Sequence, residues 1–238
     1  KALLGIIKPT RGRIKLFNNY VEQEADNTDI GVVLDNMFFP ELLTVKDIDS
    51  IMKDIYPTWD CKLYDEQLSK FGIPMDKPSK KLSKGMRKKV EIVTALAHHP
   101  KLLILDEPTS GLDPVVRSEV LDIFLDFIQD EEHTILMSTH ITSDLEHIAD
   151  RIVFIENGKV SMNDAKDEIL DNYGILKCDL EDFGQIDEKD MIAYKKNRYN
   201  YDILVDHRED KKKKYKKFCI DKITLEDLML LMIKGERR

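Results

Sequence analysis

Two short apolar runs separated by a helical pattern constrain the fold of this chain more than any other feature. The runs are Leu-Leu-Ile-Leu at residues 102–105 and Thr-Ile-Leu-Met at residues 134–137, and such runs are typical of central strands in a parallel sheet. Between them, apolar residues recur at helical spacing, at Val116, Val120, Ile123, Phe124 and Phe127. A strand, a helix and a second strand in this order predict a right-handed parallel crossover and an α/β fold.

Weaker signals predict further strands before and after this crossover. The apolar run from Ile30 to Leu34 predicts a buried strand. Residues 12–17 alternate between apolar and polar, which indicates a half-buried strand followed by a turn at Asn18-Asn19. Residues 152–155 and 159–162 flank Asn157-Gly158, and Asn-Gly is the strongest short signal for a hairpin.

Two regions differ in character from the strands. Between about residues 36 and 98 the chain becomes helical, with breaks near Pro57 and Gly72, which predicts a helical insert. After residue 163 aromatic and charged residues increase, and we expect a small α+β accessory region over residues 164–238. Its lysine-dense stretch, Lys211 to Lys217, indicates a solvated loop or hairpin rim; attraction to an anionic membrane surface is the alternative.

Composition narrows the function classes. The 238 residues suffice for one large domain or for a main domain with a small appendix. A net charge of −8 argues against a general nucleic-acid binder, although a local basic patch stays open. No apolar run approaches the ~20 residues that cross a bilayer. The three cysteines lie far apart in the sequence, so neither a zinc site nor a disulfide framework is indicated.

Two carboxylates follow the first apolar run directly. Asp106 and Glu107 stand at the carboxyl end of a predicted buried strand, which is where open α/β sheets bind ligands. Asp106 could hold Mg²⁺ through its oxygens, and Glu107 could orient or deprotonate an attacking water. Taken alone, the same segment could equally be a structural strand that meets solvent.

The neighbouring motifs favour the catalytic interpretation of Asp106 and Glu107. The loop Ser110-Gly111-Leu112-Asp113 follows the carboxylates, and His140 stands at the end of the next predicted strand. Upstream, Leu82-Ser83-Lys84-Gly85-Met86 opens a helical segment that ends near Pro100. This order resembles the ATPase domain of ABC proteins, with its signature loop, Walker B strand, D-loop and switch histidine. The resemblance covers residues 1 to about 162 and implies a P-loop NTPase-like, mostly parallel sheet over residues 1–163.

The resemblance also implies roles for single residues. Glu107 and His140 would be catalytic, with His140 donating to the γ-phosphate and holding the attacking water. Asp106 and Asp35 would contact Mg²⁺, although the family normally has glutamine where Asp35 stands. The nucleotide would be bound by Ser83, Lys84, Gly85, Met86 and Asp113.

The signature loop departs from the usual L-S-G-G-Q pattern at Lys84 and Met86. The chemistry can survive, because a serine hydroxyl and the N–H groups of a helix N-terminus still form an anion site. In the family this loop reaches the ATP that the other subunit holds.

The start of the chain also resembles a part of the family's domain. Residues 1–5 and 9–12 resemble the helix after the Walker A loop and the turn into the next strand. No G-x-x-x-x-G-K-[ST] motif occurs in the sequence. We therefore expect that loop just before Lys1, and we expect this chain to be inactive alone.

The resemblance implies an ATP-binding and ATP-hydrolysing subunit of an ABC transporter. Tyr56-Pro57-Thr58-Trp59-Asp60 and the signature loop are similar to the ABC-2-type exporter branch. Such a subunit would use ATP and Mg²⁺, and would pair with a membrane permease and a second ATP-binding subunit at the cytoplasmic face of a bacterial membrane. It would not bind nucleic acid.

Two alternatives stay open. A non-transport ABC ATPase acting on ribosomes or DNA usually carries tandem domains or a long coiled coil, and this sequence shows neither. A degenerate regulatory subunit is opposed by Asp106, Glu107 and His140, but is favoured by the lack of a phosphate loop in the sequence.

Overall fold

The computed structural model describes residues 1–21, 28–35 and 39–236. The chain forms two compact units, Lys1–His140 and Ile141–Arg238. Among the described residues, none of the helices combines the length and the apolar character required to cross a bilayer.

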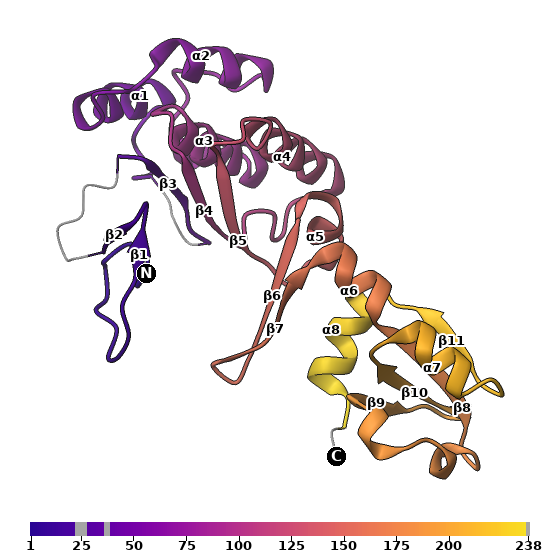
Figure 1. The fold of residues 1–238 in the computed structure, drawn as a ribbon. Helices are drawn as coiled ribbons and strands as arrows, with labels where there is room; N and C mark the ends of the chain where they lie inside the picture. The colour runs from indigo at the N-terminus through magenta and orange to yellow at the C-terminus, as the bar shows by residue number, and fades with distance from the viewer. Residues whose placement is uncertain (22–27, 36–38, 237–238) are drawn as a thin grey trace. The chain divides into compact units, whose positions relative to one another are not determined.

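The centre of the first unit is a three-stranded parallel sheet with the order β3-β4-β5 (Figure 1). Its strands are β3 (Ile30–Val33), β4 (Leu102–Asp106) and β5 (Thr134–Ser138). The helix α4 (Pro114–Phe127) connects β4 to β5, so the predicted strand, helix and strand are confirmed. Pairing in register brings Asp106 opposite Ser138, and the carboxyl ends of both strands therefore meet at one edge of the sheet.

The helical insert contains α1 (Val45–Ile55), α2 (Cys61–Lys70), a 3-10 turn at Ser79–Lys81 and α3 (Lys84–Leu96). Side-chain caps begin these helices: Thr44 forms a capping box with Asp47, and Asp60 accepts from two backbone N–H groups. The helices share one apolar core, made of Val45, Ile48, Tyr64, Leu68, Ile73, Leu82, Val90, Val93 and Ala97.

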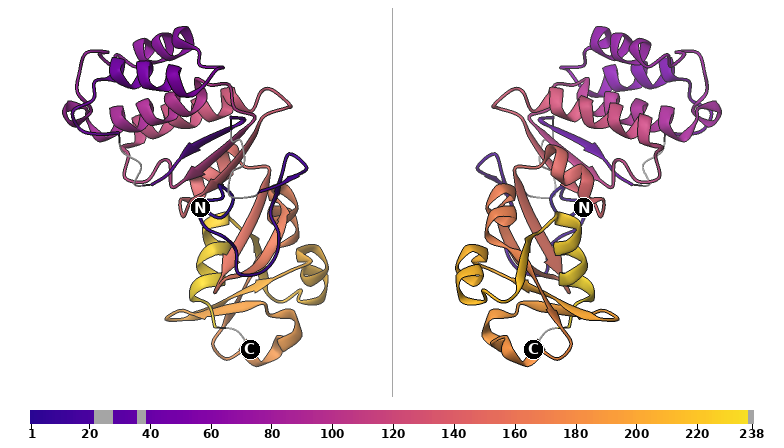
Figure 2. Two further views of the ribbon diagram at one scale, coloured as in Figure 1. Left: turned by 90° about the vertical axis from the view of Figure 1, so that its left-hand side faces the viewer. Right: turned by 90° about the vertical axis from the view of Figure 1, so that its right-hand side faces the viewer.

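The insert is joined tightly to the sheet. An added Cβ at Gly31 of β3 would lie 2.4 Å from the carbonyl oxygen of Ala95, so only glycine allows α3 to approach this strand. The helices α3 and α4 lie side by side along the sheet, as Figures 1 and 2 show. Lys89 and Glu119 link them with an ion pair of 2.5 Å. The helix α3 is therefore held by the sheet near its end and by α4 nearer its start.

A short hairpin near the chain start differs from its prediction. Its strands are β1 (Lys15–Leu16) and β2 (Asn19–Tyr20), with Leu16 opposite Asn19. The turn is Phe17-Asn18 rather than Asn18-Asn19, because these two residues take the positive φ values of 49° and 64° that a two-residue hairpin turn requires. The predicted strand at 12–17 is therefore too long.

The second unit begins with α5 (Thr142–Ile148) and an antiparallel hairpin of β6 (Arg151–Glu156) and β7 (Lys159–Ala165). Asn157 and Gly158 form its turn with positive φ, so the predicted hairpin is confirmed. A four-stranded antiparallel sheet follows, with the order β11-β8-β10-β9. Its strands are β8 (Gly174–Asp179), β9 (Ala193–Lys196), β10 (Asn200–Val205) and β11 (Cys219–Lys222).

Successive side chains of each strand point to opposite faces of this sheet, and an apolar core lies on each face. Leu204 packs with α8 (Leu225–Lys234) and with α6 (Lys166–Asn172), whereas Ile203 and Val205 face the opposite core. The 3-10 turns Phe183–Gln185 and Glu188–Asp190 and the helix α7 (Arg208–Lys214) complete the unit (Figures 1 and 2). The expected α+β character agrees with this arrangement.

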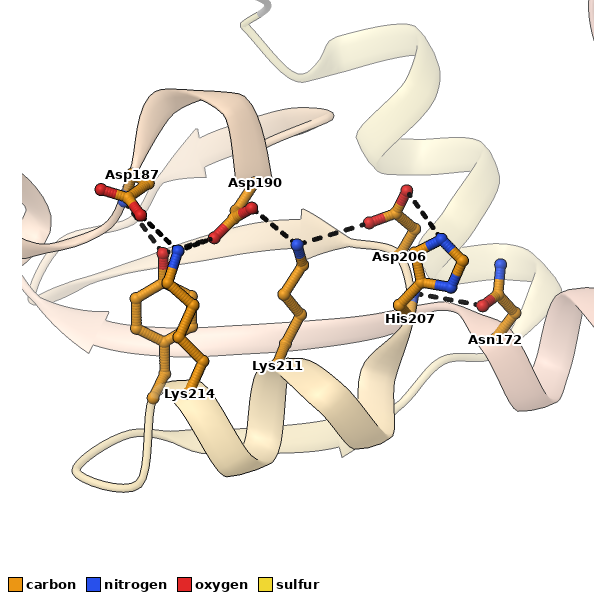
Figure 3. Close-up of polar contacts among 8 residues, drawn as sticks. Asn172, Asp187, Asp190, Asp206, His207, Lys211 and Lys214 are labelled. Carbon is orange, nitrogen blue, oxygen red and sulfur yellow. Dashed lines mark hydrogen bonds and ion pairs between the residues drawn. The ribbon is translucent and has the colours of Figure 1, made fainter.

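The lysine-dense segment differs from its prediction, because most of it is the helix α7 rather than a loop. Figure 3 shows Lys211 and Lys214 directed at carboxylates, among them Asp187 and Asp190 near the second 3-10 turn. Asp190 accepts hydrogen bonds of 2.6 Å from Lys211, Lys214 and the Tyr215 hydroxyl, and Lys214 also pairs with Asp187. Lys211 and Lys214 are thus paired with carboxylates within the chain, which weakens the alternative of attraction to a membrane surface.

Candidate functional site

The site begins where the buried strand β4 ends. Leu102, Leu103 and Leu105 are buried, and Asp106 is the first exposed residue of the strand. The Ser138 hydroxyl, at the in-register position of β5, donates a 2.5 Å hydrogen bond to Oδ1 of Asp106. The register of the sheet therefore fixes the orientation of this carboxylate.

Glu107 leaves the strand through an unusual backbone conformation. Its φ is +49°, a left-handed value that typically costs a non-glycine residue about 1–3 kcal/mol. Two backbone hydrogen bonds hold it: its N–H donates to the Ser138 carbonyl at 2.9 Å, and its carbonyl accepts from the Ser110 N–H at 3.2 Å. The strained turn redirects the Glu107 side chain away from the line of the strand.

The redirected carboxylate meets His140. Nδ1 of His140 lies 2.8 Å from Oε2 of Glu107, an ion-pair distance if the imidazole is protonated. The Glu107 side chain is 26% exposed and that of His140 68% exposed, so the pair lies at the surface of the sheet edge. Among the described residues, no group donates a well-directed hydrogen bond to the enclosed Oε2 atom. The Glu107 carboxylate is suited to accept a proton or to align a water molecule.

The signature segment is ordered by a helix cap. Oγ of Ser83 accepts a 3.2 Å hydrogen bond from the Met86 N–H and begins α3, while Ser83 and Lys84 are exposed. An added Cβ at Gly85 would lie 3.0 Å from a methyl group of Val116, so glycine permits the close packing of α3 on α4.

Asp113 has a clear structural task. Its carboxylate accepts from the N–H groups of Val115 and Val116, both at 3.1 Å, and so caps α4. This capping explains an aspartate at the position without any nucleotide. The predicted nucleotide-binding role of Asp113 stays a prediction.

Asp35 is exposed just beyond β3, which pairs with β4 through Val33 and Leu105. In the described part of the chain, no three Asp, Glu, His or Cys side chains gather into a metal-binding group. Asp106 and Asp35 are thus not joined in such a cluster, and their metal roles stay predictions. Mg²⁺ usually takes only one or two carboxylates together with water and substrate phosphates, so the exposed Asp106 carboxylate beside a hydroxyl fits that ion.

The sequence reasoning did not identify Ser138 or the contact between Lys84 and Gly111. An added Cβ at Gly111, where φ is +67°, would lie only 2.2 Å from Nζ of Lys84. Strand register could have indicated Ser138, because it ends the apolar run that pairs with β4. No local signal indicates where the Lys84 side chain lies.

Comparisons with known proteins identify the family of this chain. The ABC transporter family model matches residues 1–110. A lantibiotic transport ATP-binding protein, SrtF of Streptococcus pyogenes, is 35% identical over 162 residues, which cover 67% of this chain and 69% of SrtF. The chain belongs to the ABC transporter ATP-binding family. The family and the function class predicted from the sequence are thereby confirmed.

Other members of the ABC family support the assignment. The ABC transporter ATP-binding protein YtrB of Bacillus subtilis is 27% identical over 84% of this chain and 71% of its own length. The bacitracin transport ATP-binding protein BcrA of Bacillus licheniformis is 34% identical over 67% of this chain and 54% of its own. The matched segments thus span from about half to about seven tenths of these relatives.

Solved structures of ABC subunits share the fold. The structure of cbiO1 from Clostridium perfringens, described as part of the ABC transporter complex cbiONQ, has a TM-score of 0.58 at 29% identity. The match covers 71% of both chains. The predicted α/β, P-loop NTPase-like fold class is therefore confirmed, and nucleotide binding is the property that the family shares.

Proposed function

We propose that this chain hydrolyses ATP as the energy-coupling subunit of an ABC exporter. The observation that carries the proposal is the Glu107 and His140 pair, 2.8 Å apart at the carboxyl end of β4. Phosphoryl transfer to water depends mainly on positioning and charge stabilisation, and a carboxylate next to an imidazole can supply both to an attacking water.

Each residue of the sheet edge then has a task. Glu107 accepts a proton from the water or aligns the water through its carboxylate. His140 donates a hydrogen bond to the γ-phosphate. Asp106, oriented by Ser138, holds Mg²⁺ together with Asp35, directly or through water. Bound Mg²⁺ would neutralise charge on the phosphate oxygens.

A second copy or a related subunit completes the site. Ser83 and Lys84 are exposed and Gly85 and Met86 are partly buried at the start of α3, where N–H groups and the helix dipole favour an anion. In the proposed dimer this segment contacts the nucleotide held by the other subunit. Residues 1–163 would form the ATPase domain, and residues 164–238 an accessory region.

The transport partner is a membrane permease, and we place its docking surface within residues 36–60. Residues 36–38 lie outside the described part of the chain. On the remainder, Leu42, Ile51 and Ile55 are apolar and 75%, 40% and 58% exposed. Docking there would hold the subunit at the cytoplasmic face of the membrane. Export as the direction is supported by the similarity of residues 56–60 and the signature loop to the exporter branch, and the relatives SrtF and BcrA are named for lantibiotic and bacitracin transport.

The direct test is Glu107→Gln in the full-length protein. Glutamine keeps the shape of the side chain but is no base, so hydrolysis should fall by about 10²–10⁴. ATP binding should persist, and ATP should trap a closed dimer that sediments as such. Asp122→Asn, an exposed carboxylate on α4, is the control and should retain the parent rate. Hydrolysis at the parent rate by Glu107→Gln would show that Glu107 is not the catalytic carboxylate.

A further inference from the structure

The segment Tyr56-Pro57-Thr58-Trp59-Asp60 connects α1 to α2 and is bonded to the residues that follow α3. The Thr58 hydroxyl donates a 2.8 Å hydrogen bond to the carbonyl of His98. The Asp60 N–H donates to the carbonyl of Ala97, also at 2.8 Å. The connection between α1 and α2 is therefore tied to the point where the chain leaves α3 for β4.

His98 is the centre of this contact. It is buried, and its ring stacks on that of Tyr56 with 4.2 Å between the centroids. Nε2 of His98 lies 3.2 Å from the carbonyl oxygen of Ile30 in β3, and because a carbonyl oxygen only accepts, Nε2 carries the proton. Burial lowers the pKa of His98, so the neutral ring predominates at pH 7.

Through these contacts His98 joins the α1–α2 connection to the central sheet. Ile30 pairs in register with Leu102, the first residue of β4, and the same strand ends at Asp106. On the other side, Tyr56 is the C-cap residue of α1, and it directly follows Ile55 of the proposed docking surface. One buried side chain thus contacts both the sheet that ends in the site carboxylates and the end of the helix that carries the docking surface.

We propose that His98 is a positioning residue for energy coupling: stacked on Tyr56 and bonded to Ile30, it makes α1 follow the sheet when the nucleotide changes. The inference rests on the proposed function, since it requires ATP at the sheet edge and a permease on α1. Coupling between distant sites needs contacts that transmit movement. A hydrogen bond and a stacked ring suit this task, because each fixes direction as well as distance.

The test measures hydrogen exchange of the α1 amides in the full-length protein, with and without a non-hydrolysable ATP analogue. The analogue should change exchange in α1 of the parent. In His98→Phe, which keeps a stacked ring but lacks the N–H donor to Ile30, this change should shrink about threefold or more. Half-saturation by the analogue, measured by calorimetry, and exchange of α1 without it should both stay within about twofold of the parent. These two readouts separate lost coupling from weakened ATP binding and from local unfolding.

Two further variants separate the contacts of His98. His98→Gln offers an amide N–H to the Ile30 carbonyl without an aromatic ring, and it should recover part of the α1 response. Tyr56→Leu removes the stacked ring at a half-buried position. It should lower the α1 response as well, and it tests the proposal if His98→Phe fails to fold.

His133→Phe is the matched control. His133 stacks on Phe127 with 4.3 Å between the centroids, and its Nδ1 lies 2.9 Å from the Phe127 carbonyl oxygen. The substitution removes the same kind of hydrogen bond and keeps the same kind of stack, but it does so between α4 and β5. His133→Phe should therefore keep the parent response in α1.

The possible failures are distinguishable. An α1 response of parent size in His98→Phe and Tyr56→Leu would overturn the role of His98 while leaving the proposed ATPase intact. The same holds if the analogue binds to the parent without any change of exchange in α1. If the parent does not bind the analogue, the proposed function is overturned, and this inference with it.

Discussion

Asp190 joins the second 3-10 turn to α7 and to Tyr215 in the second unit. It is 6% exposed and accepts hydrogen bonds from Lys211, Lys214 and Tyr215. Burial by itself raises the pKa of Asp190, but these hydrogen bonds outweigh it and hold the pKa well below its usual value. Because the folded-state pKa is depressed, the stabilisation is present above the unfolded pKa and is lost as pH falls through the acid range.

We expect Asp190→Asn to lower the free energy of unfolding of this unit by about 2–4 kcal/mol, because two ammonium groups lose a buried partner. Hydrogen exchange of the β8 and β10 amides should speed up at neutral pH. Acidification below the ordinary aspartate pKa of 3.8 should destabilise the parent. The difference in free energy of unfolding between parent and variant should therefore become smaller. Asp210→Asn, which breaks the exposed pair with Lys213, should change exchange little. If the free energies of unfolding of parent and variant change in parallel with pH, this role of Asp190 is contradicted.

At the scale of elements, α3 combines structural and proposed functional demands in its first turn. Ser83 caps the helix, and the same hydroxyl belongs to the segment proposed to contact phosphate. Helix capping and phosphate contact respond differently to a negative charge at position 83. Aspartate caps a helix as well as serine does, but it would repel a phosphate.

Ser83→Ala should therefore destabilise the first unit by about 1 kcal/mol, whereas Ser83→Asp should retain stability. ATP-dependent dimerisation should be lost more completely in Ser83→Asp than in Ser83→Ala. Unfolding can be followed by the fluorescence of Trp59, the single tryptophan, which packs against the same helical core as α3. Dimerisation of Ser83→Asp at parent ATP concentrations would show that this segment does not approach the phosphates.

At the scale of the whole molecule, energy transfer requires that a change at the nucleotide moves a body in contact with the permease. We propose that the helical insert is this body, since its helices share one core and α3 is packed on β3 and α4. The three native cysteines are unpaired and can be replaced before single cysteines are introduced.

A cysteine at Ile55 should crosslink to the permease, because this apolar side chain is 58% exposed on the insert. A cysteine at Tyr199, 71% exposed in the accessory region, is the control for accessibility. Crosslinks from position 199 alone would place the docking surface outside the insert.

Several features could be predicted from local sequence alone. The apolar runs identified β3, β4 and β5, because strands buried on both faces need no polar alternation. Asn157-Gly158 identified a hairpin, because both residues tolerate positive φ. Near residue 17 the same reasoning was wrong by one position, since Phe17 adopts a left-handed conformation that its residue type does not favour.

Other features were decided only by the tertiary structure. The sequence by itself determined the family, and it predicted the residues that carry the chemistry: the strand-end carboxylates Asp106 and Glu107, and His140. The register of β4 with β5 brought Ser138 to Asp106, and the strained turn at Glu107 brought its carboxylate to His140. Packing also placed the Lys84 ammonium over Gly111. The physical reason is that propensity and periodicity act over a few neighbouring residues, whereas these contacts join positions far apart in the chain and form only when the sheet and helices pack.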